Sequence, residues 1–423
     1  MPPGGSWRTR VRGMLHQCRI GMWPVPEWIG MGGDMQGIVR RGETGNHTAD
    51  PLELFYDLVF VFTITQVSHL LLSQLSWKGA LESAIVLMAI WWSWNYTTWF
   101  TNEVDVASPV VRLLMIGLML LSLLMSISVP ESFGNRALLF AGAYVAIQLL
   151  RHGFLAFVAS RPGTLERERA LHILIWFLIA GVFWIGGALI GGHTQLLLWV
   201  LAVAIDYVAP LVTYRVPGMK PVSSDAWRVM PEHFDERFHL FIILTLGETI
   251  MITGSTTSAL PLDAGRIATF VLAFVGTVAL WWLYFQSGIT DAAHRLESSA
   301  HSTLLARDVY TYGQVPLVAA IILSAVGDEF AITHPGHHLD HGQLLVVIGG
   351  PLLFLLAEFL VFWRFTGSPL WERFAGAIVL LGVGWAGLHA DALQTSAMVT
   401  ALLVLVIIAG AFRQRRESAG AAA

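Results

Sequence analysis

Long apolar stretches alternate with short polar connections along most of the chain. A helix that crosses a bilayer needs about 20 predominantly apolar residues, and the pattern predicts twelve such helices. They are expected at residues 52–72, 79–101, 110–129, 137–159, 171–190, 195–214, 236–254, 265–286, 307–326, 343–363, 374–390 and 395–412. The pattern therefore predicts an all-α integral membrane protein that has the lipid bilayer as its partner.

The predicted helices divide into two sets of six. The longest connection, residues 215–235, contains Pro217 and Pro221 and is typical of a linker. We expect a disordered cytoplasmic tail at 1–50, a first six-helix repeat at 51–214, a cytoplasmic linker at 215–235, a second six-helix repeat at 236–412 and a cytoplasmic tail at 413–423. Because six is an even number, both repeats would have the same orientation in the membrane.

Matching segments support the internal repeat. The segment DLVFVFTITQ at 57–66 aligns with HLFIILTLGE at 239–248, which pairs Gln66 with Glu248. Repeats of this kind occur in transporters that bind a substrate between their halves, and they occur in channels and other membrane proteins as well. The repeat therefore predicts a duplicated membrane protein without deciding its activity.

Composition agrees with a membrane location and excludes several classes of function. The chain is 55% hydrophobic and 13% charged, whereas a soluble domain is about a quarter charged. The net charge of −4 argues against nucleic-acid binding. Cys18 is the single cysteine, which excludes internal disulfides and multi-cysteine metal sites.

The positions of the basic residues predict the orientation. Lys78, Arg136 and Arg266 fall on one predicted side of the membrane, and the other lysines and arginines fall on the opposite side. Basic residues concentrate in cytoplasmic loops, so we expect both termini in the cytoplasm.

Glu248 is the first candidate for chemistry. It lies twelve residues after Glu236, which is roughly 18 Å along a helix. A charge near the centre of a bilayer costs about 2.5–3.5 kcal/mol, so an ion or proton site is one interpretation. A glutamate that holds two helices together is the other. Gln66, as its repeat partner, and His69, three residues later, are expected to share this site.

A second candidate is a network of charges between the two repeats. Glu53 and Asp57 are four residues apart and share one helix face. Glu236, Arg237 and His239 stand at the matching place in the second repeat, so we expect acidic groups to meet basic ones. The network would be either a gate or a static salt bridge that joins the halves.

Other polar and aromatic positions give weaker predictions. Arg151 and Glu358 occupy similar places in the two halves, which suggests a second ion pair between them. Pro351 lies inside a predicted span, and such prolines free backbone carbonyls and often border cavities; Pro210 and Pro316 are similar cases. We expect four tryptophans of the second span to anchor it in the membrane interface, with a pore lining as the alternative: Trp91, Trp92, Trp94 and Trp99.

The histidine-rich stretch at 328–341 is expected to be a solvated loop and not a metal site. His334 and His338 are four residues apart, as in a helical metal site. Pro335 and Gly336 interrupt any regular helix there. No metal and no cofactor are therefore predicted.

Two motifs resemble the bacterial low temperature requirement protein A family. One is the Pro-Leu-Glu-Leu-Phe-x-Asp start at 51–57, and the other is the Glu-Arg…Leu-Gly-Glu helix at 236–248. The resemblance covers about residues 50–412, and His239 departs from the family pattern, in which a small or neutral residue is expected. It implies a multi-pass protein of the bacterial plasma (inner) membrane that is associated with growth in the cold, without a defined substrate or catalytic residues.

These observations favour an ion- or proton-coupled transporter of a small solute, with Glu248 and Gln66 between the repeats. A cation channel and a non-catalytic scaffold that supports growth in the cold are the alternatives, and a homo-oligomer is possible. An enzyme is not expected, because the sequence contains no nucleophile elbow, no His-Glu-x-x-His and no phosphate-binding loop.

Overall fold

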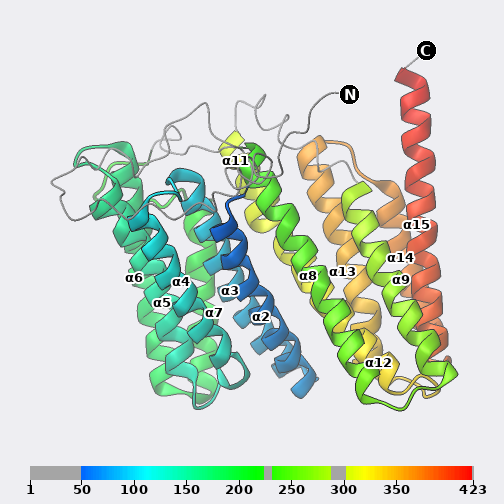
Figure 1. Ribbon diagram of the computed structural model, residues 1–423. Helices are drawn as coiled ribbons and strands as arrows, with labels where there is room; N and C mark the ends of the chain where they lie inside the picture. The colour runs from blue at the N-terminus through cyan, green and yellow to red at the C-terminus, as the bar shows by residue number, and fades with distance from the viewer. Residues whose placement is uncertain (1–48, 223–230, 287–301, 422–423) are drawn as a thin grey trace, which may run out of the picture. The chain divides into compact units, whose positions relative to one another are not determined.

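The computed structural model describes residues 49–222, 231–286 and 302–421. The predicted tail at 1–50 lies almost wholly outside these ranges, and so does part of the predicted linker at 215–235. The described residues fold into long α-helices without a named strand (Figure 1).

The helices of the first half begin with α2 (Pro51–Ser73). They continue with α3 (Trp77–Glu103), α4 (Pro109–Ser128), α5 (Ala137–Phe154), α6 (Leu165–Ile190) and α7 (Gly192–Leu211). Two short turns, η2 (Val129–Glu131) and η3 (Leu155–Ala159), extend α4 and α5.

The second half begins with α8 (Pro231–Ala259) and α9 (Ala264–Gln286). It continues with α11 (Ser302–Ala306), η6 (Arg307–Tyr312), α12 (Gln314–Thr333), α13 (His341–Thr366), α14 (Trp371–Gly387) and α15 (Ala392–Ala421). One predicted boundary is wrong in an important way. The ninth span was expected to end at residue 326, but α12 continues to Thr333 and brings Asp328 into the helix.

Ten of these helices are long and apolar enough to cross a membrane. The first and last are Pro51–Ser73 and Ala392–Arg416. Helix α14 has 17 residues, which is short for a span, and α3 is less apolar because serine, threonine and asparagine interrupt it. The chain is therefore a multi-pass helical protein with ten candidate spans among its described residues.

Local sequence explains where the helices begin. Asp50 caps α2: its side chain accepts a hydrogen bond from the backbone N–H of Leu52, and the Glu53 side chain accepts from the N–H of Asp50. Pro51 follows at the first helical position, where its missing N–H costs no helical bond. The same reciprocal capping, by Asp340 and Gln343, starts α13.

The two halves meet where α2 contacts α8 and α12 (Figure 1). Within the second half, α12 packs closely on α13. Glycines permit this approach, since a Cβ at Gly327 would lie 2.9 Å from Val347 Cα and a Cβ at Gly350 would lie 2.5 Å from Ser324 Oγ. The faces turned away from these contacts are apolar, as lipid-facing surfaces require; Leu113 is 71% exposed.

The tryptophans of α3 do not form an interfacial belt, so that prediction is wrong. Trp91 is 1% exposed and donates to the backbone oxygen of Thr311 at 2.8 Å. Trp94 is fully buried and donates to Asp57 Oδ1 at 2.8 Å. Neighbouring helices enclose α3 on most of its surface, which explains how a helix this polar is accommodated.

Candidate functional site

Arg237 joins the first turns of α2 and α8 through buried ion pairs. Its Nη1 lies 3.0 Å from Glu53 Oε1, and its Nη2 lies 2.6 Å from Asp57 Oδ1. His233 Nε2 lies 3.0 Å from the other oxygen of Glu53. All four side chains are fully buried. We call Glu53, Asp57, His233 and Arg237 the Arg237 cluster.

The cluster differs in membership from the sequence-based hypothesis. The structure brings Glu53, Asp57 and Arg237 together, but it places Glu236 and His239 elsewhere. Glu236 Oε2 accepts a hydrogen bond from the backbone N–H of Ala49 at 3.0 Å. His239 lies 3.4 Å from Asp235, a helical neighbour. Both residues therefore lie beside the cluster without contributing a charge to it.

His233 was missed by sequence reasoning, although a signal was present. It precedes Arg237 by four residues, so both occupy one face of α8. The segment at 231–235 was assigned to the linker, and the structure places it in the first turns of α8.

Glu248 lies deeper along the same helix pair. Its Oε2 accepts a hydrogen bond from Thr65 Oγ1 of α2 at 2.6 Å. Its Oε1 is buried and has no hydrogen-bond partner among the described residues. Glu248 as a whole is fully buried. A buried carboxylate with one free oxygen is costly, and groups of this kind mark ion or proton sites by default.

The expected neighbours of Glu248 are only partly in place. In the described part of the chain no hydrogen bond joins Gln66 to Glu248; Thr65, one residue earlier, makes the contact. Successive helical residues point about 100° apart, and an alignment of repeats does not fix which one faces the other half. His69 is exposed and lies within electrostatic range of both Glu248 and Glu329.

The predicted ion pair between Arg151 and Glu358 is wrong. Arg151 donates to Ser93 O at 3.0 Å and to Thr97 Oγ1 at 2.8 Å, both in its own half. Glu358 Oε2 lies 2.8 Å from Arg373 Nε, also in its own half. Arg151 is therefore hydrogen-bonded to neutral acceptors, and Glu358 is paired with an arginine, each within its own half.

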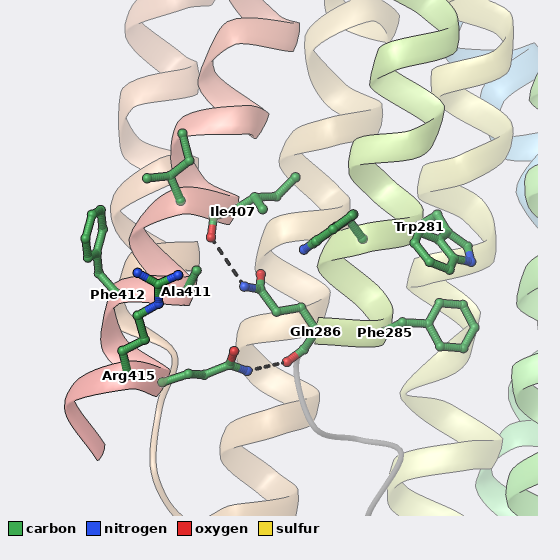
Figure 2. A pocket seen from close by; sticks show the side chains of 10 residues that line it. Trp281, Phe285, Gln286, Ile407, Ala411, Phe412 and Arg415 are labelled. Atoms are coloured by element: carbon green, nitrogen blue, oxygen red, sulfur yellow. Dashed lines mark hydrogen bonds between the residues drawn. The ribbon is translucent and has the colours of Figure 1, made fainter. Parts of the chain in front are cut away.

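A groove of about 600 Å³ lies between α9 and α15 and contains none of the predicted site residues. Figure 2 shows Gln286 between these helices, donating to the Ile407 carbonyl and accepting from the Gln414 side chain. The walls of the groove are mostly apolar, and two of the side chains that line it, Trp281 and Phe412, are 43% and 59% exposed. We interpret this groove as lipid-facing surface.

Two of the three prolines border cavities. Pro210 lines a cavity that also includes Asn95 and Thr311, and Pro351 lines another one between α9, α12, α13 and α15. Pro316 lies in the first turn of α12, where a missing N–H breaks no helical bond, so a kink is not required there.

Fold and site define a polytopic α-helical membrane protein with buried charges between two of its helices. The family model described as bacterial low temperature requirement A protein (LtrA) matches residues 48–408. The chain therefore belongs to the LtrA family, which confirms the resemblance noted in its sequence.

An uncharacterized protein of Rhizobium meliloti (strain 1021) is 36% identical over 317 residues. The match covers 75% of this chain and 78% of the relative. No solved structure gives a significant match. The comparisons thus support the family and leave the activity to be argued from the site.

Proposed function

We propose that the protein is a proton-coupled transporter of a small solute in the bacterial inner membrane, and that Glu248 carries the coupling proton. The observation that carries this proposal is the incomplete bonding of Glu248. One carboxylate oxygen bonds Thr65 at 2.6 Å, and the other is buried without a hydrogen-bond partner in the described ranges. Protonation of the free oxygen would remove a charge that the bilayer disfavours.

The location of Glu248 suits a coupling group. It lies where α8 meets α2, so a change in its charge acts directly on the contact between the halves. His69 is four residues after Thr65 and lies on the same face of α2. Since His69 is exposed and electrostatically coupled to Glu248, it would pass protons between Glu248 and the outer surface. Gln66 would line the solute path one residue away.

The Arg237 cluster would close the cytoplasmic end of the same contact. Separation of α2 from α8 at this end requires Arg237 to leave two carboxylates, at 3.0 and 2.6 Å. Protonation of Glu248 would neutralise its carboxylate and lower the free-energy cost of burying it between α2 and α8. The equilibrium between closed and open states would then shift.

The proposal includes a complete topology. Twelve crossings in two six-helix repeats would place both termini in the cytoplasm and relate the halves by an axis along the membrane normal. Helices α3 and α14 would cross as shielded or tilted spans, since α3 has 27 residues and is mostly covered by other helices.

The test is proton flux into liposomes that contain purified protein. Glu248→Gln keeps the size and the acceptor for Thr65 but removes the titrating group, so flux should fall to background. Gly247→Ala is the matched control, because nothing lies within 4 Å of a Cβ added there. It should retain flux.

Three outcomes would contradict the proposal. Equal flux in wild type and Glu248→Gln would remove Glu248 from the ion path. Absence of proton flux under every solute gradient would favour a scaffold, for which the Arg237 cluster would be the join between halves. Unitary currents in planar bilayers would instead identify a channel.

A further inference from the structure

A small cavity in the second half lies away from Glu248 and contains a different carboxylate. Asp328 contributes that carboxylate, and the walls come from α9, α12, α13 and α15. The cavity leaves about 30 Å³ free to the centres of water-sized molecules. That space holds about two waters, or one small ion in partly dehydrated form.

Asp328 has no polar partner in the part of the chain that the structure describes. Within residues 49–222, 231–286 and 302–421, neither of its oxygens makes a hydrogen bond or an ion pair. Asp328 is half-buried and lines the cavity. It lies five residues before the end of α12, which is about 8 Å along the helix. A carboxyl group in this position is either protonated or balanced by a bound positive charge.

Hydroxyl groups beside Asp328 present oxygen lone pairs. Thr277 Oγ1 donates its proton to Ala273 O at 3.1 Å and also lies within hydrogen-bond distance, 2.8 Å, of Thr249 Oγ1. Ser324 Oγ donates to Ala320 O at 2.9 Å. Since each hydroxyl has one proton, its remaining hydrogen-bonding capacity is as an acceptor. Thr277 and Ser324 therefore suit a cation better than an anion.

A backbone carbonyl adds to this set. Pro351 lies inside α13 and has no N–H, so the carbonyl of Val347, four residues earlier, loses its helical partner. Both residues line the cavity. The close contact at Gly327 and Gly350 presses this part of α13 against Asp328's helix. Freed carbonyls in interrupted membrane helices coordinate Na⁺ in this manner.

We propose that Asp328, the hydroxyls of Thr277 and Ser324 and the Val347 carbonyl form a binding site for a sodium ion. A single carboxylate balances one positive charge, and the described residues contain no group of three or more acidic or histidine side chains that could hold a metal ion. The small cavity favours Na⁺ over the larger K⁺. The site shares no residue with the Glu248 site and does not rest on the proposed transport.

The test is Na⁺-dependent thermal stability of the full-length protein in detergent. A ligand that binds only the folded state raises the unfolding temperature with concentration. The wild type should be stabilised by NaCl relative to equimolar choline chloride. Asp328→Asn should weaken the apparent Na⁺ affinity about tenfold or more, because the one formal charge among the ligands is lost.

Two controls separate a local effect from a general one. Glu329→Gln removes the neighbouring carboxylate, which does not line the cavity, and should leave the Na⁺ affinity unchanged. Glu248→Gln should also leave it unchanged, so failure of this proposal is distinguishable from failure of the proposed transport. If Asp328→Asn does not fold, Ser324→Ala and Pro351→Ala supply milder tests; each removes one oxygen ligand and should weaken Na⁺ binding.

The sodium proposal has three outcomes that would overturn it. One is equal stabilisation of the wild type by sodium and choline salts. Another is equal stabilisation by KCl and NaCl, which would exclude a site selective for sodium. The third is a Na⁺ response in Asp328→Asn or in both milder variants that matches that of the wild type.

Discussion

The contact between α2 and α8 has two regions that treat buried charge in opposite ways. At the start of both helices, Arg237 lies within 3.0 Å of Glu53 and 2.6 Å of Asp57, so opposite charges compensate each other. Deeper along the contact, Glu248 accepts a hydrogen bond from Thr65, and no ion pair to it is found among the residues that the structure describes. The charged side chains of both regions are fully buried.

This difference between the two regions suggests which charged side chains stabilise the fold and which serve the activity. Loss of one member of a paired cluster leaves an uncompensated charge in a nonpolar place, which is destabilising. Loss of a charge that was poorly compensated removes a cost and leaves the fold nearly unaffected. The Arg237 cluster should therefore govern stability, and Glu248 should govern activity.

Arg237→Gln should give the largest loss of stability. It leaves two buried carboxylates without their cation, and removal of one partner from a buried pair costs about 3–5 kcal/mol. Chemical denaturation in mixed micelles measures the free energy of unfolding. Arg112→Gln is the matched control, since Arg112 is exposed. A loss for Arg237→Gln no larger than that of this control would show that the cluster does not join the halves.

Asp57→Asn should have a smaller effect. The asparagine oxygen still accepts from Trp94 and Arg237, and Arg237 keeps Glu53, so a loss of about 2 kcal/mol is expected because the bond from Arg237 is no longer assisted by a negative charge. Asp263→Asn breaks a surface pair with Arg266, at 2.8 Å, and should cost less than about 1 kcal/mol. Similar losses for the two variants would remove the distinction between buried and surface pairs.

The sequence predicted much of the fold because lipid imposes long apolar helices with a regular pattern. The predicted spans coincide closely with the helices of the described residues, ten of which are long and apolar enough to cross a membrane. The contact of Arg237 with Glu53 and Asp57 also followed from charges at matching positions. The ends of the helices were predicted less accurately than their positions. The acidic pair at 328–329 resembled the start of a loop, although α12 continues through it.

Side-chain direction could not be read from the repeat. The alignment paired Gln66 with Glu248, but rotation of α2 about its axis turns Thr65 toward α8 instead. The alignment of Arg151 with Glu358 failed for a related reason, because similar depth in two helices does not make them neighbours. Arg373, the actual partner of Glu358, comes from the adjacent helix α14.

Thr65→Val should cost about 1 kcal/mol, which is the typical contribution of one hydrogen bond. The change preserves shape and removes the donor to Glu248. A double-mutant cycle with Glu248→Gln isolates the interaction from other effects of either change. A coupling energy near zero would show that this contact contributes nothing between the halves.

Glu248→Gln should change stability least, by less than about 0.5 kcal/mol, while it abolishes proton flux. The amide oxygen still accepts from Thr65, and the neutral side chain no longer places a charge in the apolar interior. Unfolding and flux should be measured on the same preparation, so that a loss of flux cannot be assigned to misfolding. A loss of stability comparable to that of Arg237→Gln would instead assign Glu248 a structural role, and the two regions of the contact would then differ in depth but not in kind.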